Sequence, residues 1–120
     1  MSNSREALTR LQAGNGRFVN GDVQHPNQSG ARVDALTGGQ SPFAIVLSCA
    51  DSRVPPELVF DQGLGDIFVI RVAGNVLDES VIASIEFAGG VLGAPLLVVL
   101  GHTQCGAVQA ALGNDELPGE

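Results

Sequence analysis

The middle and end of the chain contain three apolar runs separated by segments with helical spacing. The runs are residues 43–49 (FAIVLSC), 66–74 (DIFVIRVAG) and 95–101 (PLLVVLG), and such stretches are typical of parallel strands buried on both faces. Residues 78–93 carry apolar positions on one helical face, with a break expected near the glycines, and short helices are expected after the first and third runs. Strands that alternate with helices predict an α/β fold in three layers, with a central, mostly parallel sheet flanked by helices.

The first 42 residues are more polar and predict a helical arm. Residues 4–20 carry apolar residues at helical spacing, so one or two short amphipathic helices are expected, interrupted at Gly14 and Gly16. Residues 22–42 are rich in Gly, Pro, Asn and Ser, which indicates a long surface connection with a helical turn around residues 32–36. We expect this connection to wrap around the domain without packing closely against it.

Composition narrows the class of protein. The chain has 120 residues, 44% of them hydrophobic, which fits a single globular domain with one core. Its formal net charge is -7 and all six basic residues are Arg, so no basic face for nucleic acid is expected. No apolar run approaches the ~20 residues of a membrane helix, and residues 1–20 lack the apolar segment of a secretory signal. These features predict a cytoplasmic protein without nucleic-acid or membrane partners.

Three metal-binding side chains follow two of the predicted strands. Cys49 ends the run 43–49, and His102 and Cys105 come just after the run 95–101. Taken singly, they could be a buried core thiol, a hydrogen-bonded loop histidine and a small helix residue. If the two strands are neighbours, however, their carboxyl ends meet, which is where sites form in such sheets. Two thiols and one imidazole are the ligands of an open zinc site, with a fourth position left for water. Together they predict zinc binding.

The motifs around these residues resemble a known family. CADSR at 49–53, FDQGLGDIFVIRVAGNV at 60–76 and GHTQCGA at 101–107 are similar to the beta class of carbonic anhydrases, and the resemblance runs from about residue 7 to residue 112. It implies a parallel sheet in the order 2-1-3-4 and a protein that works as a homodimer or a multiple of dimers. It also implies reversible hydration of carbon dioxide to bicarbonate and a proton by a zinc-bound hydroxide.

By the same resemblance, Cys49, His102 and Cys105 would be the ligands of Zn2+, and Asp51 and Arg53 would be a catalytic dyad. The spacing agrees with these roles. Asp51 lies two residues beyond Cys49 in an extended segment, so its side chain returns to the same side and can orient the zinc-bound hydroxide. Arg53 is placed to hold that carboxylate in a bidentate pair. Without this hold, Asp51 could swing onto the zinc and expel the water.

One further segment adjoins the predicted site. Residues 73–76 (AGNV) follow the second strand, so Gly74 and Asn75 could line the crevice. A plain turn is the interpretation that we favour for them.

The sequence departs from the family at its end. It stops at Glu120, where the family continues, so the fourth strand is expected to be missing and residues 96–100 to form an exposed apolar edge. The chain would then be either a fragment or a short natural form that closes its sheet through a partner subunit. We expect one zinc-binding α/β domain over residues 1–120, with a helical arm at about 4–40 and a zinc-binding core at about 42–113.

Other functions stay open at this point. The chain could be a truncated zinc-binding domain with little or no activity. It could also be a relative that hydrolyses carbonyl sulfide or carbon disulfide, which the same nucleophile could attack. A redox dithiol is a weaker hypothesis, because no C-x-x-C motif pairs the cysteines.

Overall fold

The central strand of the sheet, β1 (Ala44–Ser48), is paired on both sides and is buried at every position. It pairs in parallel with β2 (Ile67–Arg71) on one side and with β3 (Leu97–Leu100) on the other, which gives the strand order β2-β1-β3. The computed structural model describes residues 3–113. Within that range the three expected strands are confirmed. Their order, β2-β1-β3, matches the first three positions of the expected order 2-1-3-4.

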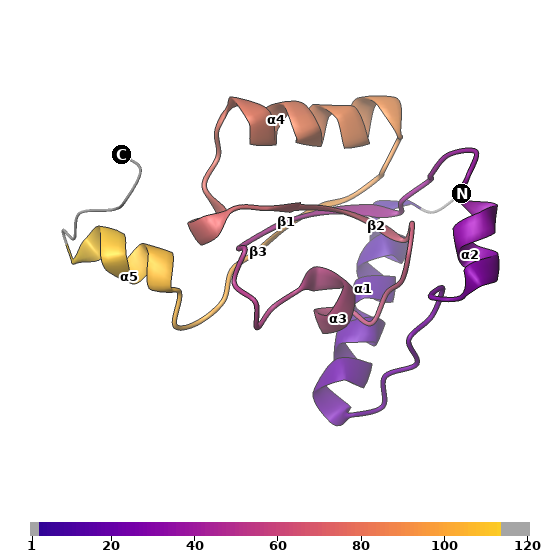
Figure 1. Ribbon diagram of the computed structural model, residues 1–120, viewed down its shortest axis with the longest axis horizontal. Helices are drawn as coiled ribbons and strands as arrows, with labels where there is room; N and C mark the ends of the chain where they lie inside the picture. Colours follow the sequence, from indigo (N-terminus) through magenta and orange to yellow (C-terminus); the bar gives the residue numbers. More distant parts are fainter. Residues whose placement is uncertain (1–2, 114–120) are drawn as a thin grey trace.

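Helices cover both faces of this sheet (Figure 1). One face carries α4 (Glu79–Glu86), and the other carries α1 (Ser4–Asn20) and α3 (Pro56–Val59). The predicted three-layer α/β fold is therefore confirmed. The remaining elements are α2 (Gly30–Ala35), α5 (Gly106–Leu112), the 3-10 turn η1 (Ala73–Asn75) and the π-helical segment η2 (Phe87–Val91). None of the helices in residues 3–113 combines the length and apolar character needed to cross a bilayer.

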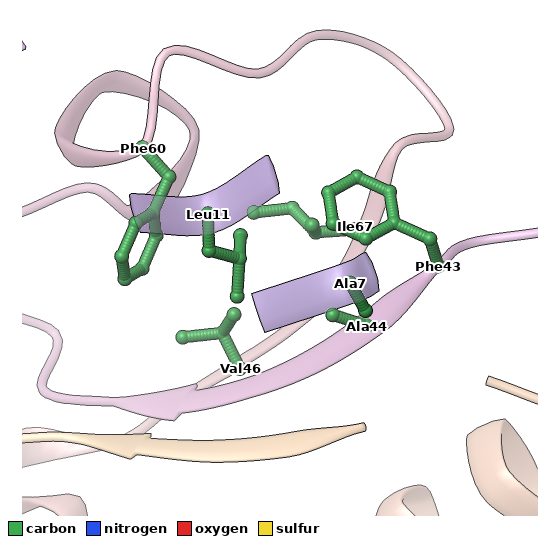
Figure 2. Packing of buried hydrophobic residues seen from close by; sticks show 7 residues of the cluster. All are labelled: Ala7, Leu11, Phe43, Ala44, Val46, Phe60 and Ile67. Carbon is green, nitrogen blue, oxygen red and sulfur yellow. The ribbon is translucent and has the colours of Figure 1, made fainter. Parts of the chain in front are cut away.

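The main hydrophobic core lies between α1 and the sheet (Figure 2). Its buried members are Ala7, Leu11, Phe43, Ala44, Val46, Phe60 and Ile67. Alternate residues of the strands point to the opposite face, where Phe68 of β2 packs against Phe87 with ring centroids 6.1 Å apart. Full burial of a side chain such as Leu11 contributes roughly 1.5–3 kcal/mol, so this core fixes α1 on the sheet.

Helix α4 changes geometry where the sequence predicts a break. Asp78 caps its start, because its side-chain Oδ1 accepts a hydrogen bond from the backbone N–H of Val81 at 2.9 Å. The α-helix ends at Glu86 and the chain continues as η2 through the two glycines. Gly93 then takes a left-handed φ of 75° and turns the chain toward β3.

The expectation that glycines interrupt the first helix is wrong. α1 runs without a break for 17 residues, and Gly14 is buried inside it. A Cβ atom at Gly14 would lie 1.7 Å from the carbonyl oxygen of Phe60, whereas Gly16 has open space around it. Next to Gly14, the side-chain Nδ2 of Asn15 donates to the carbonyl of Val59 at 2.9 Å. A glycine at position 14 lets α1 approach the backbone that follows α3. Local sequence patterns do not reveal this contact.

The polar connection after α1 is tied down more firmly than expected. Its side chains are mostly exposed, but its backbone is held by Asp61, which is 2% exposed. Asp61 accepts hydrogen bonds from the Arg17 side chain at 2.6 Å and from the backbone N–H groups of Gln24 and His25 at 2.9 and 3.0 Å. The idea that this segment wraps without close contacts is therefore wrong at this point.

A second buried carboxylate repeats the arrangement further along the same connection. Asp66 is 5% exposed and accepts hydrogen bonds from Asn27 Nδ2 at 2.9 and 3.0 Å and from the backbone N–H of Gly63 at 2.7 Å. These two carboxylates attach the helical arm to the loop that leads into β2.

The far edge of the sheet is apolar. Among the described residues β3 pairs only with β1, and its Leu97 and Val99 are 43% and 63% exposed. The exposed edge predicted at residues 96–100 is therefore present in this part of the chain. Residues 114–120 lie outside the described range.

Gly14→Ala is expected to lower the free energy of unfolding by about 1–3 kcal/mol or more, because the added methyl group must displace the Phe60 carbonyl. Gly16→Ala, in the same helix, should raise it by up to about 1 kcal/mol through helix propensity. Urea unfolding of both variants checks this. Equal stabilities would mean that α1 does not approach the Phe60 backbone closely.

Asp61 makes stability depend on acid. Burial alone would raise the pKa of its carboxyl, but the hydrogen bonds from Arg17 and from the backbone of Gln24 and His25 outweigh burial and lower the pKa. A lowered folded-state pKa stabilises the fold above the unfolded pKa of about 3.9, and this stabilisation is lost as pH falls through the folded-state pKa.

Asp61→Asn should therefore cost roughly 1–3 kcal/mol at pH 7, and the gap to the wild type should narrow below pH ~4. The exposed Asp34→Asn is the matched control and should change little. Urea unfolding over pH 2–8 measures both. A gap that stays constant with pH would contradict this role for the Asp61 charge.

Candidate metal centre

The parallel pairing of β1 with β3 brings the predicted ligands together. Cys49 follows β1, and His102 and Cys105 follow β3. One ligand atom from each of the three lies within 4.8 Å of the others, and the two Sγ atoms are 3.9 Å apart. Cys49 is buried, while the other two are partly buried. The residues that the sequence singled out thus form one cluster at the carboxyl ends of neighbouring strands.

A short turn shapes the His102–Cys105 half of the cluster. Gln104 adopts a left-handed φ of 58°, which turns the chain between the two ligands. Cys105 then stands at the start of α5 in an extended conformation, before the first helical residue, Gly106. A histidine and a cysteine three positions apart can in this way face the same point.

The imidazole of His102 is oriented as a ligand. Its Nδ1 lies 2.8 Å from the carbonyl oxygen of Thr103, and this acceptor places the proton on Nδ1. Nε2 is consequently left with a lone pair, and it is buried without a hydrogen-bond partner among the described residues. Burying a polar atom without a partner lowers stability by about 1–3 kcal/mol, so a group bound to this nitrogen would stabilise the site. A metal ion bound by Nε2 and the two sulfurs would be such a group.

The electrostatics of the cluster also favour a cation. The backbone N–H of Gly74 donates to Cys49 Sγ at 3.2 Å. This bond, followed by the neighbouring imidazole of His102, lowers the pKa of Cys49 to about 6 although burial opposes it. The thiolate in turn, together with the Thr103 carbonyl, raises the pKa of His102. Both shifts reflect a site that stabilises positive charge next to sulfur, and the donor set of two thiolates and one imidazole fits Zn2+.

Asp51 and Arg53 form the bidentate pair that the sequence predicts. Arg53 Nε donates to Asp51 Oδ1 at 2.9 Å and Nη2 donates to Oδ2 at 2.6 Å. Asp51 Oδ2 lies 3.9 Å from His102 Nε2, so the carboxylate faces the cluster. The Arg53 side chain, then its backbone N–H, holds the pKa of Asp51 well below its usual range. Asp51 is therefore ionised beside the candidate metal position.

Arg53 makes one contact that the sequence did not indicate. Its Nη2 also donates to the carbonyl of Gln104 at 2.9 Å. The same guanidinium therefore links the segment after β1 with the turn after β3.

Sequence reasoning also missed the contribution of β2. Arg71 ends β2 and donates to the carbonyls of Cys49 and Asp51 at 2.9 and 2.6 Å. Asn75 Nδ2 donates to the carbonyl of Leu100 at 2.7 Å. The interpretation of residues 73–76 as a plain turn is wrong, because Gly74 contacts a candidate ligand directly. In the sequence, the available signal for Arg71 and Asn75 was their position at the end of the second predicted strand, next to the strand that leads to Cys49.

Fold and site together define an α/β protein with a two-cysteine, one-histidine candidate metal centre at the carboxyl ends of its parallel strands. The profile of the family described as "Carbonic anhydrase" matches residues 44–119. This match covers more than half of the sequence, and the chain belongs to the carbonic anhydrase family.

Individual relatives agree. "Carbonic anhydrase 2" of Mycobacterium tuberculosis is 54% identical over 121 residues, covering 98% of this chain and 58% of that protein. The beta-carbonic anhydrase CafA of Aspergillus fumigatus superposes with a TM-score of 0.68 at 40% identity, over 72% of this chain and 43% of that one. A chain from the crystal structures of two tetrameric beta-carbonic anhydrases of Sordaria macrospora is matched at a TM-score of 0.66 and 34% identity, over 73% of this chain and 46% of that one.

These matches confirm the resemblance to the beta class. The chain spans only 58% of the length of the curated Mycobacterium tuberculosis relative.

Replacing any of the three candidate ligands should reduce bound zinc. Cys49→Ser, His102→Ala and Cys105→Ser each remove one donor from the cluster, so zinc retained after dialysis should fall well below one equivalent. Mass spectrometry of metals against protein concentration provides the measurement.

His25→Asn is the control for the zinc measurement. His25 is the other histidine, it is exposed, and its left-handed φ of 49° suits asparagine. Full zinc content in this variant is expected. Undiminished zinc in all three ligand variants would rule out the centre.

Proposed function

We propose that the chain is a zinc enzyme that catalyses the reversible hydration of carbon dioxide to bicarbonate and a proton. The observation that carries this proposal is the buried Nε2 of His102, which has no hydrogen-bond partner within residues 3–113 and lies beside two thiols, with the ionised Asp51 3.9 Å away. The names of the relatives support the reaction, and the match of the donor set to Zn2+ supports the metal. We further propose that residues 1–120 form one zinc-binding domain, with an arm at about 4–40 and a core at about 42–113.

Cys49, His102 and Cys105 would hold the zinc ion, leaving its fourth position open. The bound ion would supply a Lewis acid that lowers the pKa of a water molecule, so that hydroxide is available near neutral pH. Because two thiolates offset the charge of a divalent ion, more of the activation falls to neighbouring groups. The nearest such group is the carboxylate of Asp51.

Asp51 would orient the nucleophile. Its carboxylate accepts hydrogen bonds only, because Arg53 keeps it ionised. Accepting a hydrogen bond from the nucleophilic hydroxyl at Oδ2 would turn the oxygen lone pair toward the carbon of carbon dioxide. The side chain of Asp51 is 14% exposed, so little bulk water competes for this contact.

Arg53 would act as a restraint on Asp51. Two donated hydrogen bonds fix both carboxylate oxygens, and the third, to Gln104, fixes the guanidinium itself. This hold would keep Asp51 from rotating toward a bound metal ion.

Assembly and location are part of the proposal. We propose a homodimer or a multiple of dimers, supported by the description of the Sordaria macrospora relatives as tetrameric and by the exposed apolar residues of β3. We place the protein in the cytoplasm, because free thiols persist in a reducing compartment and must stay reduced to bind zinc.

A zinc-binding domain with little or no activity is the second candidate. It is favoured by one observation, namely that the chain spans 58% of the curated relative's length. No contact among residues 3–113 selects carbonyl sulfide or carbon disulfide over carbon dioxide.

The zinc-replete full chain should hydrate carbon dioxide in a stopped-flow pH-indicator assay. Arg53→Ala should lower kcat at least ~10-fold with its zinc content retained, because Asp51 loses its restraint. Arg53→Lys should recover only part of the rate, since an ammonium cannot make the bidentate pair.

The outcomes separate the candidates. A zinc-loaded wild type that is monomeric by light scattering and inactive would favour the inactive domain. An Arg53→Ala variant with an unchanged rate would remove the restraint from the mechanism, while leaving the hydration reaction itself in place.

A further inference from the structure

The turn η1 at the end of β2 contacts Cys49 and both elements that flank the other two candidate ligands, β3 and α5, although it supplies no ligand itself. From this placement we infer that Asn75, together with Arg71, is a positioning residue that sets the spacing between the two halves of the metal centre. The first half is Cys49 with Asp51, and the second half is the turn from His102 to Cys105. The inference rests on the proposed zinc centre and adds to it the residues that hold its geometry.

The backbone of the first half is held from β2. The guanidinium of Arg71 spans the carbonyls of Cys49 and Asp51, at 2.9 and 2.6 Å, and so brackets the residue between them. The parallel ladder continues past the end of β1, with Ala50 N–H donating to Val72 at 3.2 Å and Val72 N–H donating to Ser48 at 3.1 Å. The segment that presents the Cys49 thiol is thus held along its backbone.

The second half is reached by Asn75. In the order β2-β1-β3 the outer strands do not pair with each other, because β1 lies between them. The bond from Asn75 Nδ2 to the carbonyl of Leu100, at 2.7 Å, nevertheless joins the end of β2 to the end of β3. Leu100 is the last residue of β3 and stands two positions before His102. This bond therefore crosses the end of β1, where Cys49 sits.

Helix α5 provides the third contact. A Cβ atom at Gly74 would lie 3.5 Å from the Cβ of Ala107 and 3.9 Å from Val108 Cγ2, so η1 packs against the first turns of the helix that follows Cys105. Gly74 also donates its N–H to Cys49 Sγ. One three-residue turn thus touches a ligand of the first half and the two elements on either side of the second half.

The backbone at Asn75 explains why asparagine stands there. Its φ is 49°, in the left-handed region that asparagine and glycine tolerate. Its backbone N–H closes the turn on Val72 at 3.0 Å, which leaves the side-chain amide free to donate outward. A short donor at this φ is what the bond to Leu100 needs. Asparagine tolerates this φ and supplies the donor. Glycine tolerates the φ but has no side-chain donor, and aspartate also lacks a side-chain donor.

Zinc sets a strict demand on this arrangement. Its thiolate and imidazole ligands must stand about 2.0–2.3 Å from one point in tetrahedral geometry. The β1–β3 ladder and the bond from Arg53 to the Gln104 carbonyl also join the two halves, so loss of the link between the ends of β2 and β3 is expected to loosen the second half against the first and to weaken the convergence of the ligands. Outer groups that orient ligands typically change metal affinity 10–100-fold when they are removed.

The test measures zinc affinity of the full chain by competition with a chromophoric chelator. Asn75→Gly keeps the left-handed φ but removes the amide, and Asn75→Asp keeps the size but removes the donor. Both should raise the zinc Kd roughly 10–100-fold, and should change the absorption spectrum of the cobalt(II)-substituted protein. Arg71→Lys, which cannot span two carbonyls, should weaken zinc binding in the same direction.

Asn15→Ala is the matched control. It removes the same kind of bond, from a side-chain Nδ2 to a backbone carbonyl at 2.9 Å, between α1 and α3, away from the centre. It should lower stability in urea and leave the zinc Kd unchanged.

The results discriminate clearly. If the Asn75 variants lose stability as Asn15→Ala does and bind zinc as tightly as the wild type, Asn75 is merely structural and the inference is overturned. If the wild type itself binds no zinc, the proposed centre fails instead. Should Asn75→Gly be too unstable to purify, Asn75→Asp and Arg71→Lys carry the same comparison, and unaltered zinc Kd values in both overturn the inference.

Discussion

The parallel pairing of β1 with β3 is the constraint on which the rest of the structure depends. In its register Ser48 stands opposite Leu100, so both strands end at the same level of the sheet. The residues that follow them, far apart in the sequence, therefore emerge side by side. A shift of register by a residue or two would separate Cys49 from His102 by several ångströms, and no local adjustment of loops would restore the cluster.

Much of the fold could be predicted because it is encoded in short-range patterns. The run 43–49 is apolar at nearly every position, and in the structure the strand within it is buried throughout. Gly14 shows the opposite case. Its role depends on the carbonyl of Phe60, a residue remote in sequence, so helix propensity suggested a break where close packing required a glycine. Asp61 likewise accepts hydrogen bonds from three donors that lie 44, 37 and 36 positions before it in the sequence.

Some residues of the candidate site could likewise be predicted from the sequence, and others could not. Cys49, Asp51 and Arg53 were predictable because they lie close together in the sequence and because their residue types indicate a metal ligand and a bidentate ion pair, which Asp51 and Arg53 form across a short turn. Arg71 and Asn75 act on backbone carbonyls instead. Any residue supplies a carbonyl, so these contacts leave no characteristic pairing of residue types in the sequence. They become visible only when the strand order is known.

The hydrogen bond from Gly74 to the Cys49 sulfur has a consequence for how the centre fills. Because the pKa of the Cys49 thiol is about 6, the thiol is mostly deprotonated at neutral pH. Metal uptake normally releases protons from its ligands and therefore weakens as the solution becomes more acidic. The turn at Gly74 thus prepares one candidate ligand for a metal ion, whereas a proton on His102, whose pKa the thiolate raises, must still leave before its imidazole nitrogen can bind.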